Sequence, residues 1–175
     1  GPKTCCLVIL SQWIWFCLVI VTQTYHSPSW NVSFVGVKNF FQRNRADGLI
    51  NLFALNHHID AGQDKDTLFD IELESFEQYL KINLTSLFST CREFARYNKK
   101  GSIINFSSTY GVVSPLKNLY SEEEKHIGYS VSKAGVIMLT KHLATHLAPD
   151  IRVNTIIPGG VYNNQSKEFI KKYSN

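Results

Sequence analysis

Three side chains between Ser108 and Lys133 could together perform acid–base chemistry. Tyr129 and Lys133 stand four residues apart in GYSVSKAG, and Ser108 lies twenty-one residues before the tyrosine. Four residues span about one helical turn, so a helix would place the phenol and the ammonium on one face. The unperturbed pKa of tyrosine, about 10, is too high for proton exchange near neutrality, and a nearby cation should lower it. The spacing therefore predicts a proton donor and acceptor.

The flanking sequence predicts the elements that position these side chains. Residues 101–108 (GSIINFSS) are typical of a short buried parallel strand, with Ser108 at its carboxyl end. A long helical pattern covers residues 127–148, and a second strand-like run covers residues 151–157. A strand, a helix and a strand in this order make a right-handed crossover. Since ligands bind beyond the carboxyl ends of parallel strands, Ser108 and the turn at 158–160 should face one crevice.

A further helix is predicted over residues 73–97. Asn83 lies within it, beside its apolar stripe. Because a mid-helix amide has low helix propensity and needs hydrogen-bond partners, Asn83 either faces solvent or belongs to a polar network. The apolar residues that recur at helical spacing are Phe76, Leu80, Leu84, Leu87, Phe88, Cys91, Phe94 and Ala95.

From about Leu49 onward, the chain resembles the short-chain dehydrogenases/reductases. The resemblance rests on four motifs in the family's order, which are Asn83, INFSS at 104–108, YSVSK at 129–133 and IRVNTIIPGG at 151–160. It implies an α/β fold with a Rossmann-like, doubly wound parallel sheet in three layers, incomplete in its N-terminal glycine-motif half and at its C-terminus. The segments SSTYGVVSP and PGGVYNNQ are similar to a bacterial branch associated with flagellin or surface-glycan modification.

The resemblance implies hydride transfer between NAD or NADP and a small-molecule carbonyl or secondary alcohol, with a sugar-related compound as one candidate. Tyr129 would be the general acid–base catalyst, and Ser108 would hydrogen-bond the substrate oxygen. Lys133 would bind the nicotinamide ribose, and Asn83 would hold a water that links Lys133 to solvent. The implied catalytic residues are Asn83, Ser108, Tyr129 and Lys133. The implied cofactor-binding residues are Asn56, Tyr129, Lys133, Pro158, Gly159 and Val161.

Each of these assignments has a simpler alternative. Ser107 and Ser108 could be ordinary turn residues after a strand. Tyr129 and Lys133 could be an exposed helical pair. The ordered motifs around them favour the catalytic interpretation.

The glycine-rich turn that such a cofactor site needs has no counterpart in the first half of the chain. That turn joins the first strand to the first helix, because only glycine lets the backbone approach the pyrophosphate. The glycines before residue 63 are Gly1, Gly36, Gly48 and Gly62, and they form no such run. The family's NNAG segment is also altered within residues 49–62, where Asn56 is the nearest counterpart.

An apolar stretch from Cys5 to Val21 opens the chain. Ser11 and Gln12 interrupt it, and its length falls just short of the roughly 20 residues that a bilayer span requires. It could be a membrane-associated segment, a buried strand–helix remnant or the product of an altered reading frame. We therefore divide the chain into an atypical segment, 1–48, and a catalytic portion, 49–175.

Composition favours a single α/β domain without a nucleic-acid-binding surface. The net charge of +4 comes from scattered lysines and arginines. The four cysteines and six histidines show no metal-ligand spacing. We therefore expect no metal site, no disulfide framework and a reducing, cytoplasmic location.

Two further expectations concern assembly and the alternative function. The helices at 76–95 and 129–147 carry more apolar surface than one sheet face needs, and in the resembling family they pair across a twofold axis. A homodimer or homotetramer is therefore expected, with no membrane partner. The alternative function is a non-catalytic fragment or interaction module that lacks cofactor binding, which the missing glycine turn favours.

Overall fold

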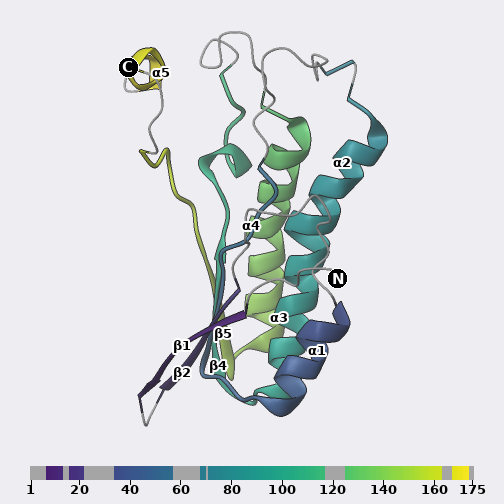
Figure 1. Cartoon of the computed structure of the whole chain (residues 1–175), viewed down its shortest axis with the longest axis vertical. Helices are drawn as coiled ribbons and strands as arrows, with labels where there is room; N and C mark the ends of the chain where they lie inside the picture. The colour runs from purple at the N-terminus through teal and green to yellow at the C-terminus, as the bar shows by residue number, and fades with distance from the viewer. Residues whose placement is uncertain are drawn as a thin grey trace.

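A computed structural model describes residues 7–13, 16–21, 34–56, 68–69, 71–116, 125–162 and 167–173. Within these residues the chain forms a five-stranded sheet in the order β1-β2-β3-β4-β5 (Figure 1). The first two strands, β1 (Leu7–Trp13) and β2 (Phe16–Val21), are antiparallel. The strands β2, β3 (Gly48–Asn51), β4 (Gly101–Phe106) and β5 (Ile151–Ile156) run parallel. The predicted α/β class with a parallel sheet is confirmed.

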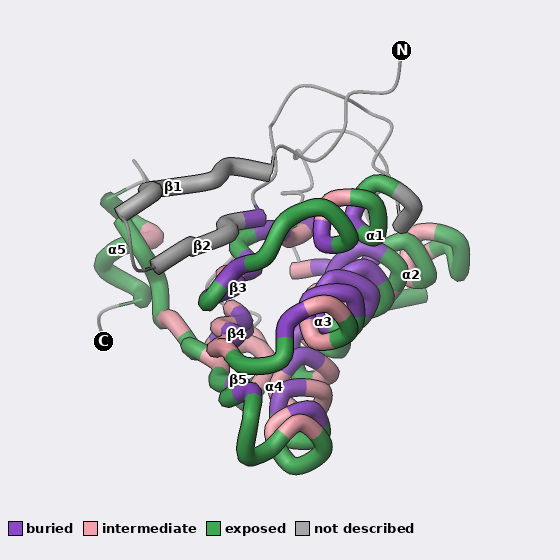
Figure 2. Tube along the Cα trace, turned by 90° about the horizontal axis from the view of Figure 1, so that it is seen from below, coloured by how far each residue is buried: buried purple, intermediate pink, exposed green. Residues whose placement is uncertain are grey.

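Helices join each parallel strand to the next. They are α1 (Phe34–Arg43) before β3, then α2 (Leu73–Leu80), η1 (Lys81–Thr85) and α3 (Ser86–Tyr97) before β4, and α4 (Ile127–Leu147) before β5. Because each parallel strand is the neighbour of the one before it, right-handed crossovers put these helices on one face of the sheet, as Figure 2 shows for α1, α3 and α4. The helix α5 (Lys167–Tyr173) lies on the opposite side in both views. The described part of the chain thus has one principal helix layer, in agreement with the expected incompleteness.

The core lies between the sheet and this helix layer. Side chains alternate along β4, where Ile103 and Asn105 are buried while Ile104 and Phe106 are only half-buried. The Phe94 ring of α3 meets an α1 phenylalanine, Phe41, edge to face, with 5.7 Å between ring centroids. Fully burying a side chain of this size contributes roughly 1.5–3 kcal/mol. Further members of this core are Val21, Val37, Leu49, Val136, Leu143 and Val153.

The N-terminal apolar stretch joins the sheet as strands. The strand β2 pairs with β3 from Leu18 to Val21, and Val21 is fully buried in the core. Both β2 and α1 precede residue 48, yet they extend the same sheet and the same helix layer as the residues after it. Among the described residues, no helix is both long and apolar enough to cross a membrane.

The helix predicted over residues 73–97 is interrupted, which corrects the expectation of one regular helix. Its hydrogen-bond ladder widens into the π-turn η1 between α2 and α3. The Ser86 hydroxyl donates to the Lys81 carbonyl over 3.0 Å and thereby supports the widened turn. The helix predicted over 127–148 is confirmed as α4, and the two predicted strands are β4 and β5.

Candidate active site

The loops that follow β4 and β5 lie side by side at one edge of the sheet. The Ser107 N–H donates to the Ile156 carbonyl at 2.9 Å, and the Thr109 N–H donates to the Pro158 carbonyl at 3.1 Å. Ser108, between these donors, is buried. The structure therefore brings Ser108 and the loop that starts at Pro158 together, as the sequence predicts.

Tyr129 lies in the first turn of α4 and is half-buried. Burial raises the pKa of its phenol above the ordinary value of 10, and the Tyr110 phenol adds to the rise. A hydrogen-bonding interaction with the Ser108 side chain acts in the opposite direction and lowers that pKa. The phenol is therefore a protonated group near neutrality. The buried side chains against which Tyr129 packs are Leu55, Tyr79 and Ile82.

Lys133 lies one turn further along α4 and is only 4% exposed. Its Nζ donates to the Phe106 carbonyl at the end of β4 over 2.8 Å and lies 5.8 Å from the centroid of the Tyr129 ring. Burial lowers the pKa of Lys133 from 10.5 to about 8. The expectation that this cation lowers the pKa of Tyr129 is not met in this structure, because burial opposes the charged form of both groups.

The short 3₁₀ turn η2 (Thr109–Gly111) holds Ser108 against α4. Ser107, the residue before Ser108, donates through Oγ to the Lys133 carbonyl at 2.7 Å. The Ser108 Oγ accepts from the Tyr110 N–H at 3.2 Å. Gly111 is so close to α4 that a Cβ there would lie 2.7 and 2.8 Å from the carbonyl carbon and oxygen of Lys133. Ser108 therefore has a turn-forming role in addition to its place beside the phenol.

Asn83 lies in the π-turn η1 and is buried. Its Oδ1 accepts from the Leu55 N–H at 2.6 Å, and its Nδ2 donates to the Leu55 carbonyl at 3.1 Å and to the Ser132 Oγ at 3.0 Å. Ser132 stands between Tyr129 and Lys133 on α4. Of the two alternatives for Asn83, solvent exposure or a polar network, the structure shows the network. Single π-turns of this kind are frequent at functional sites.

Lys125, just before α4, was not predicted as a site residue. Its Nζ lies 4.8 Å from the centroid of the Tyr129 ring and donates a hydrogen bond to the Asn56 Oδ1. Burial lowers the pKa of Lys125 from 10.5 to about 8. The sequence signal that could have identified it is a lysine two residues before the helix that carries Tyr129.

His126, the next residue, was also missed. Its Nδ1 accepts from the Gly128 N–H at 3.0 Å and so caps α4, while its Nε2 lies 3.1 Å from the Ser75 Oγ. Its ring stacks on Tyr79 of α2, with 4.2 Å between centroids. Histidine is not among the preferred N-cap residues, so sequence reasoning does not identify it as one.

The predicted cofactor-binding residues lie in three segments around this edge. Asn56 follows β3 and is exposed, Tyr129 and Lys133 lie on α4, and the remaining three belong to the loop after β5. In that loop, the Gly160 N–H donates to the Tyr173 hydroxyl at 2.7 Å and ties the loop to α5. The loop members of the predicted set are the half-buried Pro158 and the exposed Gly159 and Val161.

The donor chemistry at this edge suits the nicotinamide end of a dinucleotide. The Lys133 ammonium has three donor hydrogens, and ribose hydroxyls are acceptors that match it. A Cβ at Gly159 would meet only the Tyr173 hydroxyl, at 3.7 Å, so the loop leaves space there. The segment 22–33 between β2 and α1 contains no glycine, and it does not match a pyrophosphate-binding turn.

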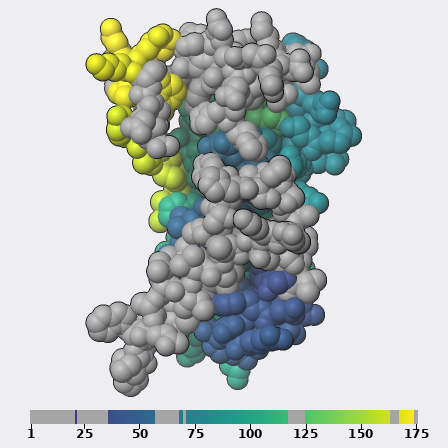
Figure 3. Space-filling view, in the orientation of Figure 1, coloured from purple at the N-terminus to yellow at the C-terminus, as the bar shows by residue number. Residues whose placement is uncertain are grey.

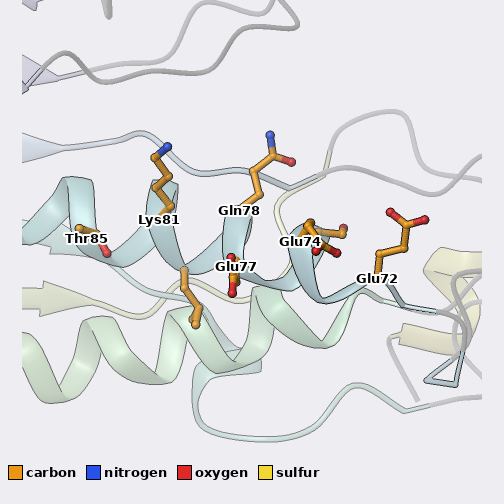
Figure 4. Close-up of a pocket in the computed structure, with 8 residues that line it drawn as sticks. Glu72, Glu74, Glu77, Gln78, Lys81 and Thr85 are labelled. Carbon is orange, nitrogen blue, oxygen red and sulfur yellow. The ribbon is translucent and has the colours of Figure 1, made fainter.

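An open groove of about 700 Å³ along α2 and η1 is separate from these residues (Figure 4). Most of its lining residues are exposed, three of the eight are glutamates, and none of the predicted site residues contributes to it. On the face that Figure 3 presents, α2 and α1 come to the surface near opposite ends of the molecule. The residues that line the groove are Glu72, Glu74, Ser75, Glu77, Gln78, Leu80, Lys81 and Thr85.

Residues 42–174 match the family described as short chain dehydrogenase. The chain therefore belongs to the short-chain dehydrogenase/reductase family. It is 31% identical over 140 residues to the Post-translational flagellin modification protein A of Campylobacter coli, covering 77% of this chain and 54% of that protein. It is also 35% identical over 97 residues to the glucose 1-dehydrogenase of Gluconobacter oxydans, covering 53% of this chain and 34% of that protein.

A solved structure of the same family shares the fold. The crystal structure of a short-chain dehydrogenase from Leptospira borgpetersenii with bound NAD+ matches with a TM-score of 0.69 at 31% identity. The match covers 88% of this chain and 65% of that one. The chain spans about half the length of its curated relatives or less, 54% of the flagellin modification protein and 34% of the glucose dehydrogenase.

Proposed function

We propose that this protein is an NAD(P)-dependent oxidoreductase that interconverts a carbonyl and a secondary alcohol. The observation that carries the proposal is the convergence of Ser108, Tyr129 and Lys133 at the edge of the sheet where β4 and β5 end. Membership of the short-chain dehydrogenase/reductase family supports it. Similarity to a glucose dehydrogenase and a flagellin modification protein supports a sugar-related substrate.

In the direction of reduction, Tyr129 would donate a proton to the substrate oxygen. Its raised pKa keeps the phenol protonated near neutrality, which is the form that a general acid needs. The Ser108 hydroxyl, which interacts with the phenol, would hydrogen-bond the same substrate oxygen and orient it. The nicotinamide cofactor, when bound, supplies or accepts the hydride. The Lys133 ammonium would favour the phenolate that remains after proton transfer.

The remaining predicted residues would support this chemistry from around the site. Lys133 would bind the nicotinamide ribose, and Asn56 and the loop residues Pro158, Gly159 and Val161 would line the cofactor. Asn83 would act indirectly, through a water that links Lys133 to solvent. The hydrogen bond from Asn83 to Ser132, which lies between Tyr129 and Lys133 on α4, supports this role.

We also infer that the protein assembles as a homodimer or homotetramer in the cytoplasm. Val131 and Met138 of α4 are 43% and 63% exposed and lie on one side of the helix, where a second copy could cover them. The buried free thiol of Cys91 agrees with a reducing compartment.

The substitution Tyr129→Phe tests the proposed chemistry. It removes the hydroxyl and leaves the ring against its buried neighbours, so the fold should remain. At saturating NADH or NADPH and a carbonyl substrate, kcat should fall by about 10²- to 10⁴-fold. Tyr97→Phe, at the end of α3, is the matched control and should keep wild-type turnover. Wild-type turnover in Tyr129→Phe would contradict the assignment.

The second candidate, a non-catalytic interaction module, is favoured by the glycine-free segment 22–33 alone. It differs from the first in one measurable property, the binding of nicotinamide cofactors. Titrating NADH and NADPH against tryptophan fluorescence distinguishes them. Saturable binding supports the enzyme, and its absence at millimolar concentrations, with intact fold, supports the module.

A further inference from the structure

Lys125 places a second cation beside the proposed acid–base residue. Its ammonium lies 4.8 Å from the centroid of the Tyr129 ring, closer than that of Lys133 at 5.8 Å. Its hydrogen-bond acceptor is the Asn56 amide oxygen. The proposed proton transfer uses Lys133 and gives Lys125 no role.

The charge of Lys125 has neutral partners among the described residues. Asn56 is an uncharged amide, and the Tyr129 phenol is protonated near neutrality. The ion pairs found within the described ranges join Glu93 to Arg92 and Arg96, and Glu168 to Lys172. Residues 122–124, which are glutamates, lie outside those ranges.

This position disfavours an isolated cation. Lys125 is half-buried, and burial is what lowers the pKa of its ammonium to about 8. Withdrawing a charge from water is unfavourable unless an opposite charge or strong hydrogen bonds compensate for it. An anionic ligand group beside Lys125 would supply that compensation and would make a charge-assisted hydrogen bond.

We propose that Lys125 binds an anionic group of the substrate, a carboxylate or a phosphate, beside the reacting carbonyl. This inference rests on the proposed function, since it names the substrate class of the same site. An oxygen bonded to Nζ at about 2.8 Å would lie within about 8 Å of the Tyr129 ring centroid. The anion and the reacting carbon therefore belong to one small molecule, the size of a short keto acid or a monosaccharide derivative.

Matched pairs of compounds test this directly by calorimetric binding at pH 7. Acetoacetate and its ethyl ester share the ketone and differ in charge. Glucose 6-phosphate and glucose form the corresponding phosphate pair. We expect the anionic member of at least one pair to bind about tenfold more tightly or better. The pair that shows the preference identifies the group as a carboxylate or a phosphate.

Three substitutions assign the preference to Lys125. Lys125→Met should remove it and Lys125→Arg should retain it. Lys141→Met, at an exposed lysine about 18 Å from Tyr129 along the axis of α4, is the matched control and should leave it unchanged. Asn56→Asp provides a second route if Lys125→Met does not fold. Asn56 is exposed, and its carboxylate variant would pair with Lys125 and should also abolish the preference.

The outcomes separate this inference from the proposed function. Equal binding within both pairs, or a preference that survives in both Lys125→Met and Asn56→Asp, would overturn the anion site. A Lys125-dependent preference without any turnover of NADH or NADPH would support the anion site and contradict the oxidoreductase. Turnover of charged and neutral ketones alike, with equal binding of both, would support the oxidoreductase and contradict the anion site.

Discussion

Lys133 holds an ammonium in an almost fully buried position next to the half-buried phenol of Tyr129. Its pKa is lowered from 10.5 to about 8, a difference worth roughly 3 kcal/mol between the two protonation states. Between pH 8 and 10 the unfolded chain thus binds more protons at this residue than the folded chain. The free energy of unfolding should consequently rise with pH in this window.

Urea unfolding at several pH values between 8 and 10 tests this prediction. In Lys133→Met the Lys133 part of the rise should disappear, so the difference in stability between variant and wild type should change by up to roughly 3 kcal/mol. The exposed Lys38→Met is the control and should keep the wild-type slope. Parallel curves for wild type and Lys133→Met would show that the ammonium is not buried in solution.

The sequence predicted the pairing of Tyr129 with Lys133 but not the protonation of either. Helical spacing alone places two residues four apart on one face. The direction of a pKa shift depends on burial, and Tyr129 is covered by Leu55, Tyr79 and Ile82, which come from distant parts of the chain. Lys125 and Asn56 illustrate the same limit, since they are 69 residues apart and meet only in the fold.

At the scale of elements, the turn η2 depends on Gly111. A Cβ there would come within 2.8 Å of the Lys133 backbone and 2.8 Å of the Ser107 Oγ. We expect Gly111→Ala to push η2 away from α4, destabilising the protein by about 1–3 kcal/mol and displacing Ser108 from Tyr129. Thermal unfolding and turnover are the measurements. Gly36→Ala, at an exposed position in α1, should be neutral or stabilising. Wild-type stability in Gly111→Ala would contradict this packing.

The π-turn η1 depends on Asn83 in a similar way. Its amide satisfies both the N–H and the carbonyl of Leu55, which is 1% exposed. Asn83→Ala leaves these buried groups without their side-chain partner, at a cost of about 1–3 kcal/mol in unfolding free energy. Urea unfolding of Asn83→Ala against Thr85→Ala, an exposed position in the same turn, measures the difference. Equal stabilities would mean that solvent replaces the amide.

The helix predicted over residues 73–97, which η1 interrupts, shows which part of an element can be predicted from a sequence. Apolar periodicity located α2 and α3 correctly, because it records which face is buried. The widened turn carries Asn83, whose contact with Leu55, 28 residues away, is not contained in the periodicity.

For the whole molecule, the strand–helix–strand order predicted β4, α4 and β5 and their place in one parallel sheet. The apolar stretch before it was ambiguous, since continuous hydrophobicity does not distinguish a buried strand from a helix. The antiparallel strands β1 and β2 account for most of its length. The strand β2 then takes the place beside β3, and the single described helix layer on one face follows from that order.

The exposed apolar side chains of α4 lead to a prediction about assembly. If Val131 and Met138 meet a second copy, Met138→Glu would bury a carboxylate in that contact and should shift the protein toward monomers. Sedimentation velocity at several concentrations measures the shift. Lys38→Glu, on exposed α1 surface, should keep the wild-type oligomer. A folded wild-type chain that is monomeric at all concentrations would rule the assembly out.

Residues 22–33, which connect β2 to α1, lead to a prediction about the binding of a nicotinamide cofactor. Hydride transfer requires the nicotinamide to be held against the substrate, and a misplacement of about 1 Å can reduce the rate around a hundredfold. Segment 22–33 has no glycine to admit a pyrophosphate, so NADH and NADPH should bind more weakly than the micromolar range. Replacing it with a glycine-rich turn from a family member should increase affinity and turnover together, whereas the same graft with its glycines changed to alanine should not. Micromolar binding by the unmodified chain would show that other residues anchor the dinucleotide.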